Sequence, residues 1–163
     1  MELNMGTADD EWLTVALETD PRVMAELGGP WTADEARAAH RRRMATIAND
    51  GNWWFTVVPE PGARPIGTIG VWASEVDGHA VNEAGWMILP EHQGCGYATE
   101  ALRLLLELAR ADGKWGDIHA YPGATNAASN ALCRKSGFEH LGSLDVEYAG
   151  RPLKVNDWVW RAG

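Results

Sequence analysis

The spacing of apolar residues divides the chain into a helical first third and an extended part that follows. Up to residue 50, apolar positions recur at intervals of three and four, which is the spacing of one helix face. Thr32 and Glu35 form a capping box before the third of these helices, and Gly51 supplies its stop. The elements expected here are a short strand at 3–5 and helices at 8–17, at 20–27 and behind 32–35.

Beyond Gly51 the apolar residues mostly alternate with polar ones, which is the pattern of strands. Helical spacing returns twice, from Ala98 to the glycine stop at Gly113 and from Asn126 to Gly137. We therefore predict one α/β domain over residues 1–163, with a mixed, mostly antiparallel sheet flanked by helices. The expected strands of this part lie at 53–58, 66–73, 80–89, 117–121, 138–147 and 152–160.

The composition narrows the class of protein without naming a reaction. A formal net charge of -9 argues against a nucleic-acid surface and mildly favours a cationic partner such as an amine. Cys95 and Cys133 have no C-x-x-C partner, so we expect neither a disulfide nor a metal site. The sequence shows no signal-peptide pattern and no run of about 18 apolar residues. We expect no membrane partner, a cytoplasmic location and a monomer or homodimer.

The stretch from Glu83 to Leu106 carries the strongest functional signal. A buried strand ends at Pro90, and a loop with two glycines then leads directly into a helix. Such a turn points several unpaired N–H groups and the positive end of the helix dipole at one spot, which predicts a phosphate site. The chain has no G-x-x-x-x-G-K-[S/T] string, and Thr99 replaces the third glycine of a dinucleotide fingerprint. The sequence thus disfavours both of these nucleotide-binding loops.

The loop does fit the pattern [Q/R]-x-x-G-x-[G/A], which Gln93, Gly96 and Ala98 satisfy. The segment from Asn126 to Phe138 fits a second pattern, N-x-x-S-N-x-x-x-x-K-x-G-F. In these two motifs the sequence resembles the GNAT superfamily of acetyl-CoA-dependent N-acetyltransferases, and in particular its RimJ/RimL-like branch. The resemblance implies that the fourth and fifth strands splay apart to hold the pantetheine arm of acetyl-CoA.

The resemblance also implies which residues bind this cofactor. The main chain of the fourth strand would bond the pantetheine arm, and the amides of the glycine loop would take the diphosphate. Arg134 and Lys135 would either reach the 3′-phosphate or remain solvated helix charges. The cofactor-binding residues implied are Met87, Ile88, Leu89, Gln93, Gly94, Cys95, Gly96, Tyr97, Ala98, Thr99, Asn126 and Ser129.

Acetyl transfer to an amine needs a base for the amine, a donor for the oxyanion and an acid for the leaving thiolate. A main-chain N–H near Ile88 is the expected oxyanion donor. Many relatives use a tyrosine as the acid, but Cys133 holds that position here. Ser129 matches the serine of the RimJ/RimL-like branch, and we expect it to be the acid, with Cys133 as its competitor. Two carboxylates are candidates for the base, Glu147 ahead of Glu83.

The expected acceptor is a primary amine, either the N-terminal α-amine of a protein or peptide or a small-molecule amine. Deprotonation at pH 7 costs about 1 kcal/mol for an α-amine and about 4–5 kcal/mol for a lysine side chain, which favours the α-amine. Trp31 and the turn at 28–30 are expected at the acceptor mouth. Two other hypotheses stay open, a catalytically silent acyl-CoA-binding sensor and a detoxifying acetyltransferase of small amines or antibiotics.

Overall fold

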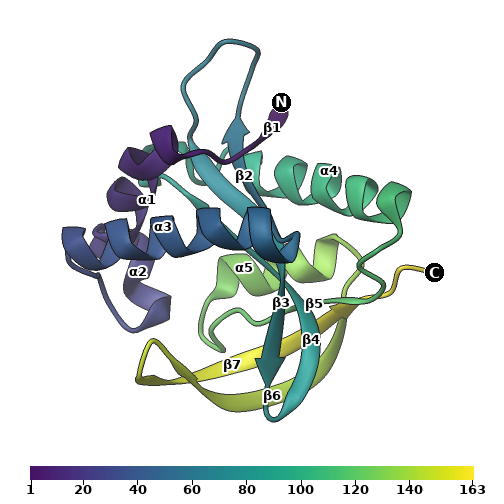
Figure 1. Ribbon diagram of the computed structural model, residues 1–163. Coiled ribbons are helices and arrows are strands. Elements are labelled where there is room, and N and C mark those ends of the chain that lie inside the picture. The colour runs from purple at the N-terminus through teal and green to yellow at the C-terminus, as the bar shows by residue number, and fades with distance from the viewer.

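The computed structural model describes residues 1–163 and contains a seven-stranded sheet flanked by helices (Figure 1). The helices are η1 (Ala8–Asp10), α1 (Glu11–Glu18), α2 (Pro21–Met24), η2 (Ala25–Leu27), α3 (Ala33–Asp50), η3 (Pro90–His92), α4 (Tyr97–Asp112) and α5 (Ala127–Lys135), where η marks a 3₁₀ helix. The strands are β1 (Glu2–Met5), β2 (Trp53–Val58), β3 (Gly67–Val76), β4 (His79–Ile88), β5 (Ile118–Ala120), β6 (Glu139–Tyr148) and β7 (Arg151–Trp160). None of the helices combines the length and the hydropathy needed to cross a bilayer.

The strands lie in the order β1-β2-β3-β4-β5-β7-β6. Neighbouring strands pair antiparallel throughout, except for the parallel pair of β4 and β5. The predicted mixed, mostly antiparallel sheet is therefore confirmed. The last hairpin inserts β7 beside β5 and leaves β6 at the edge of the sheet.

The parallel pair of β4 and β5 holds for only two residue pairs, Glu83 with His119 and Ala84 with Ala120. β4 continues along β3 as far as Ile88, whereas β5 ends at Ala120. The two strands separate beyond these pairs, which is the predicted splay between the fourth and fifth strands.

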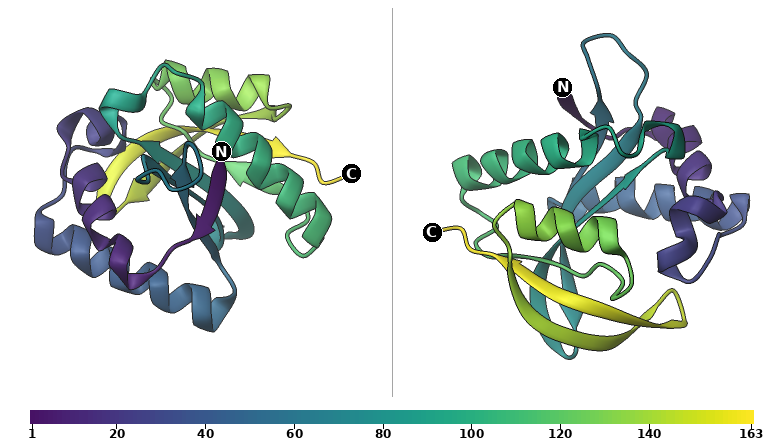
Figure 2. Two further views of the ribbon diagram at one scale, coloured as in Figure 1. Left: turned by 90° about the horizontal axis from the view of Figure 1, so that it is seen from above. Right: turned by 180° about the vertical axis from the view of Figure 1, so that it is seen from behind.

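Helices α4 and α5 cover one face of the sheet, and α1, α2 and α3 cover the other (Figure 2). The main core of 20 buried residues lies on the α4 face, where Leu102 and Leu105 of α4 and Ile69 and Val71 of β3 are fully buried. The cluster is held together by the regular alternation of β2, β3 and β4, which sends every second side chain to this face.

The first two predicted helices are each divided in the structure. The helix expected at 8–17 is split into η1 and α1, and the helix expected at 20–27 is split into α2 and η2. Pro21 occupies the first turn of α2, and Gly28 ends η2 in the left-handed conformation with φ 87°. Short 3₁₀ turns are common at such helix ends because they satisfy backbone groups that the α-helix leaves unpaired.

The predicted ends of α3 agree with the structure, whereas the predicted ends of β5 do not. Thr32 and Glu35 form the capping box of α3, and Gly51 ends that helix with φ 69°, as the sequence predicts. The fifth strand is shorter than the expected 117–121, because it lies between the left-handed Gly116 and the Pro122 that cannot donate to a ladder.

Candidate active site

The glycine loop between η3 and α4 has an open, left-handed backbone. Gly94 and Gly96 adopt φ angles of 71° and 84°, and Gly96 is the N-cap residue of α4. A Cβ at either position would meet no atom within 4 Å, so glycine is required for the backbone angle and not to avoid a clash. No side chain caps α4, and its first turn stays open.

This turn presents a row of free main-chain donors. Gln93 N–H donates to the carbonyl of Pro90, and Glu100 N–H donates to the carbonyl of Gly96. The six N–H groups between them, from Gly94 to Thr99, donate to no protein acceptor. The positive end of the α4 dipole lies at the same place. Such a row of donors is suited to the oxygens of a diphosphate.

The side chain of Gln93 connects this loop to the end of β4. Its Nε2 atom donates to the carbonyl oxygen of Ile88 at 2.9 Å. This bond holds the glycine loop, with its row of N–H groups, close to the end of β4 that borders the splay. In the structure Gln93 therefore supports the loop through the protein's own main chain.

The alternation of β4 decides which main-chain groups face the splay. Leu89 N–H donates to the carbonyl of Ile66 at 2.8 Å, so the main chain of Leu89 faces β3. Successive residues of a strand point their N–H and C=O groups to opposite sides. Ile88 and Trp86 therefore turn theirs toward the splay, while Met87 turns its own toward β3. The N–H of Ile88 therefore points into the splay.

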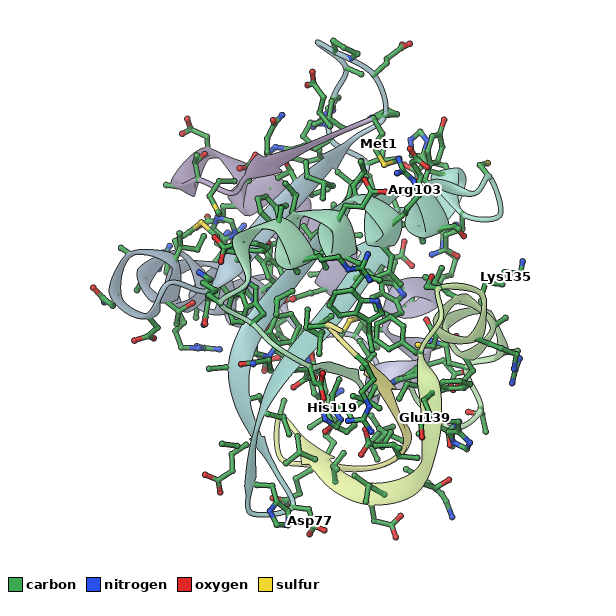
Figure 3. The ribbon with its side chains drawn as sticks, turned by 90° about the vertical axis from the view of Figure 1, so that its right-hand side faces the viewer. Met1, Asp77, Arg103, His119, Lys135 and Glu139 are labelled. Carbon is green, nitrogen blue, oxygen red and sulfur yellow. The ribbon has the colours of Figure 1, made fainter.

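A cavity of about 1070 Å³ passes through the splay and joins the glycine loop to the α1–α3 side of the sheet. Lys135 also lines this cavity at its rim, and its side chain extends outward from α5 (Figure 3). Leu89, Cys95, Arg134 and Glu147 do not line it. The predicted site residues that do are Glu83, Met87, Ile88, Gln93, Gly94, Gly96, Tyr97, Ala98, Thr99, Asn126 and Ser129.

Ser129 lies in the first turn of α5 with its hydroxyl free. The side chain of Asn126 caps this helix by accepting from Ser129 N–H at 3.1 Å. The Ser129 hydroxyl makes no hydrogen bond to the protein and belongs to the cavity wall. Asn126 thus positions the turn, and Ser129 offers a proton donor to whatever fills the cavity.

Asn130, the second asparagine of the same motif, has a structural role that the sequence analysis did not assign. Its amide donates to the carbonyls of Gly123 at 3.0 Å and Asn126 at 2.7 Å. Its Oδ1 accepts from Trp158 Nε1 and from Asn156 Nδ2, each at 2.8 Å. These four bonds tie the segment after β5 to α5 and β7.

Cys133, the competing acid, is completely buried in the main core and does not line the cavity. Burial raises the pKa of Cys133 to about 12, because the thiolate would lose its hydration. A thiol in this position cannot reach a group in the cavity. Of the two candidates, the structure brings only Ser129 to the site.

The two candidate bases lie in different surroundings. Glu83 lines the cavity at the start of the splay, and burial raises its pKa above the ordinary value of a glutamate. Side-chain donors on Ser74 and Trp72 and the charge of His119 act in the opposite direction but are outweighed. Glu147 is exposed on β6 and points away from the cavity. This placement reverses the order of preference and puts Glu83 first.

Aromatic side chains line the part of the cavity that contains Glu83. Trp31 and Tyr148 lie with ring centroids 6.1 Å apart, and Trp54 and Trp72 lie 6.2 Å apart. All four line the cavity. The indole and phenol faces offer a surface that attracts a cationic amine.

The floor of this part of the cavity is fixed by a buried ion pair. Arg43 of α3 pairs with Glu18 of α1, whose side chain is 1% exposed, and its guanidinium lies over the Trp54 ring at 4.5 Å from the centroid. Burial raises the pKa of Glu18, and the charge of Arg43 opposes that change. Since breaking a buried pair leaves an uncompensated charge, the pair should hold Trp54 firmly against the cavity.

A family model described as an acetyltransferase (GNAT) domain matches residues 3–139 of the sequence. The chain belongs to the GNAT acetyltransferase family. A search of curated proteins found none that matches the sequence.

Solved structures share this GNAT fold at low identity. An acetyltransferase of the GNAT family from Bacillus anthracis has a TM-score of 0.80 at 19% identity, with 98% of this chain and 93% of that chain covered. A ribosomal-protein-alanine N-acetyltransferase from Brucella melitensis has 0.78 at 23%, with 99% of each chain covered. A spermidine N-acetyltransferase from Vibrio cholerae, in complex with CoA and spermine, has 0.79 at 21%, with 99% and 95% covered.

The GNAT family match stops at the first residue of β6, so the hairpin that carries Tyr148 lies beyond it. Sequence reasoning missed Tyr148, together with Trp72 and Trp86. A signal for Tyr148 exists, because Leu144, Val146 and Tyr148 alternate with acidic and polar residues along β6. That alternation places Tyr148 on the inward face and its neighbour Glu147 on the outward face.

Proposed function

We propose that this GNAT protein transfers the acetyl group of acetyl-CoA to a primary amine by direct attack of the amine on the thioester. The observation that carries the proposal is the continuity of the 1070 Å³ cavity. It joins an anion site made of six free N–H groups to a half-buried carboxylate, Glu83, through the splay. Acetyl-CoA requires an anion site for its diphosphate and a slot for its pantetheine arm, and a basic amine requires a group that accepts its proton.

Acetyl-CoA would bind mainly to the main chain of the protein. Its diphosphate suits the N–H groups of Gly94 to Thr99, and its pantetheine arm would bond the groups that Trp86 and Ile88 turn toward the splay. Lys135 at the cavity rim can meet the negatively charged 3′-phosphate. Two solved GNAT neighbours, a RimL acetyltransferase and a YncA acetyltransferase, carry coenzyme A and acetyl-CoA, which supports this choice of co-substrate.

The chemical step needs three groups at the splay. The amine nitrogen attacks the thioester carbon, and the Ile88 N–H donates to the oxygen that becomes negative. When the carbon–sulfur bond breaks, Ser129 gives its proton to the departing thiolate. The amine enters as an ammonium ion and gives its first proton to Glu83, directly or through water. The second proton that its nitrogen loses after the attack replaces the one that Ser129 gave to the thiolate, so an amide, a thiol and a neutral Ser129 hydroxyl remain.

Glu83 suits the role of base because its pKa is raised. A carboxylate with the ordinary pKa of about 4.3 is a weak proton acceptor, and burial moves Glu83 toward the neutral range in which general bases work best. Glu147, exposed to solvent on the outer face of β6, has no path to an amine in the cavity. We therefore assign the base to Glu83.

We infer that the acceptor has a low-pKa amine, such as the N-terminal α-amine of a peptide. The cost of deprotonation at pH 7, about 1 kcal/mol for an α-amine against about 4–5 kcal/mol for lysine, supports this choice. The motif around Ser129 and the fold shared with a ribosomal-protein-alanine N-acetyltransferase point the same way, toward the RimJ/RimL-like branch. Small amines remain the second candidate, because a spermidine N-acetyltransferase is an equally similar neighbour.

A thiol-release screen with acetyl-CoA tests this proposal. The panel holds peptides with free and with blocked N-termini, polyamines and aminoglycosides, and mass spectrometry of the products locates the acetyl group. We expect release with free peptides and a loss of release when the N-terminus is blocked. Tight binding of acetyl-CoA without release over the whole panel would instead establish a silent acyl-CoA-binding sensor.

A further inference from the structure

A second group of titratable side chains lies directly behind Glu83. His119 is the register partner of Glu83 in the parallel pair of β4 and β5, so both side chains leave the same face of the sheet at neighbouring positions. His119 Nδ1 lies 2.7 Å from Oδ1 of Asp157 on β7. The imidazole also stacks on Tyr121, with centroids 5.8 Å apart and planes at 10°. These contacts hold the ring between the β3–β4 hairpin and the β6–β7 hairpin (Figure 3).

His119 belongs to a different cavity from Glu83. This second cavity, of about 350 Å³, is lined by His119, Ser74, Asn82 and Asp117 among others. It opens to solvent, because Ala80 and Asp117 on its wall are exposed. Glu83 lines the main cavity, and positive charge on His119 lowers the pKa of Glu83. The Glu83–His119 pair thus stands between the two cavities.

We propose that His119, oriented by Asp157, is a positioning residue that carries the proton of the acceptor amine from Glu83 to solvent in the second cavity. This inference rests on the proposed function, because it needs Glu83 to take that proton. The geometry that supports it is the adjacent register of Glu83 and His119, the 2.7 Å contact to Asp157 and the separate opening of the second cavity.

The proton balance of this relay closes without any other reactant. The Asp157 carboxylate accepts the Nδ1 proton of neutral His119, which leaves the Nε2 lone pair free. The protonated Glu83 gives its proton to Nε2, so that the carboxylate is restored and an imidazolium forms beside Asp157. The imidazolium then releases the Nε2 proton to water. Each turnover returns both side chains to their starting forms and delivers one proton to solvent.

A relay is useful here because bound substrates cover the side of Glu83 that faces the main cavity. Burial raises the pKa of both Tyr121 and Tyr148, so neither phenol exchanges protons near neutral pH. Asp117 is already paired with Arg161 at 2.9 Å. Imidazole, by contrast, accepts and releases protons in this range. The titratable groups that face the Glu83–His119 pair from the neighbouring elements are Tyr121, Tyr148, Asp157 and Asp117.

Two substitutions of His119 separate proton transfer from support. His119→Asn keeps an N–H donor near the position of Nδ1, so it can still bond Asp157, but it cannot accept a proton. His119→Ala removes both properties and leaves room for free imidazole. His79→Asn, at the exposed first residue of β4, is the matched control. The measurements are kcat for thiol release across pH, rescue by added imidazole, and acetyl-CoA affinity by calorimetry.

We expect both His119 variants to lose roughly tenfold in kcat, less than the about 10²–10⁴-fold of a direct general base. Their acetyl-CoA affinity should equal that of the wild type, and imidazole should restore His119→Ala but not His119→Asn. His79→Asn should behave like the wild type. A His119→Asn variant with wild-type kcat and pH profile would overturn the relay and leave His119 a support for Glu83.

The failure of the relay can be told from the failure of the proposed function. If wild-type protein releases no thiol with any amine, the proposed function is wrong and the relay falls with it. If Glu83→Gln is as active as the wild type, the base is wrong, and the relay is overturned as well. If Glu83→Gln is inactive while both His119 variants are fully active, only the relay is wrong.

Discussion

The two ends of the main cavity are built from different parts of the polypeptide. The end that we propose for acetyl-CoA, here called the cofactor end, consists of main-chain donors, the N–H groups of Gly94 to Thr99 and of Ile88. The end that we propose for the amine, here called the acceptor end, consists of side chains from several elements, among them Trp31, Trp72 and Glu83. A main-chain site depends on backbone angles and tolerates changes of side chain, whereas a side-chain site depends on the identity of each residue. Substitutions at the two ends should therefore separate acetyl-CoA binding from acceptor chemistry.

The largest effect is expected from Glu83→Gln, which removes the proposed base without changing the shape of the cavity. A general base contributes about 10²–10⁴-fold, so kcat for thiol release should fall by that factor. Acetyl-CoA affinity, measured by calorimetry, should stay unchanged because Glu83 lies at the acceptor end. Glu147→Gln is the matched control on the exposed face of β6 and should keep full activity. Equal losses of kcat in Glu83→Gln and Glu147→Gln would contradict the assignment of Glu83 as the base.

Ser129→Ala tests the proposed acid at the boundary of the two ends. Its hydroxyl is free in the cavity, and its loss should lower kcat by about 10²-fold with little change in acetyl-CoA affinity. Cys133→Ala is the comparison, because Cys133 is buried in the core. That variant should lose thermal stability and keep kcat. Full activity of the serine variant together with a collapse of the cysteine variant would reverse the assignment.

Gly96→Val tests whether the cofactor end depends on backbone angles. Gly96 has φ 84°, and a β-branched residue is disfavoured there by about 1–2 kcal/mol. The loop should shift, and the dissociation constant of acetyl-CoA should rise by about tenfold or more. Gly62→Val, at φ 80° in an open turn away from the cavity, carries the same strain without touching the site. Unchanged affinity in Gly96→Val with a folded protein would mean that the loop does not hold the diphosphate.

Trp31→Ala should have the smallest effect, confined to the acceptor. Trp31 lies beside Tyr148 at the cavity wall, and an exposed cation–π contact contributes about 0.5–1 kcal/mol. The acceptor KM should rise by about two- to fivefold, with acetyl-CoA affinity unchanged. Trp12→Ala, whose indole lies under Arg64 outside the cavity, is the control. A lower melting temperature with unaltered kinetics would give Trp31 a structural role only.

The cofactor end could largely be predicted from the sequence because local chemistry determines it. The left-handed angles of Gly94 and Gly96, the cap of Asn126 on α5 and the stop of β4 before Pro90 all arise from residues within one turn of each other. Which main-chain groups of β4 can contact a cofactor could not be predicted in this way. It depends on which residues of β4 turn their N–H and C=O groups toward β3, that is, on the phase of the strand. That phase turns Ile88 and Trp86 toward the splay, and it appears only once the pairing with β3 is known.

The acceptor end could not be predicted in the same way, because contacts distant in sequence assemble it. The choice between Glu83 and Glu147 depends on the register of the last hairpin, where a shift by one residue would exchange Glu147 for Tyr148 at the cavity. The ion pair of Glu18 with Arg43 and the contact of His119 with Asp157 join different elements. No periodicity along the chain indicates such partners.

The pH dependence of kcat, measured for the wild type and Glu83→Gln at saturating substrates, tests the central claim most directly. Only the ionised carboxylate can accept the amine proton, so kcat should rise with pH through the pKa of Glu83. Because burial raises that pKa, the acidic limb of the wild type should lie above the ordinary glutamate pKa of about 4.3. We predict that Glu83→Gln loses this limb while Glu147→Gln keeps it. A limb that persists in Glu83→Gln and disappears in Glu147→Gln would contradict the account.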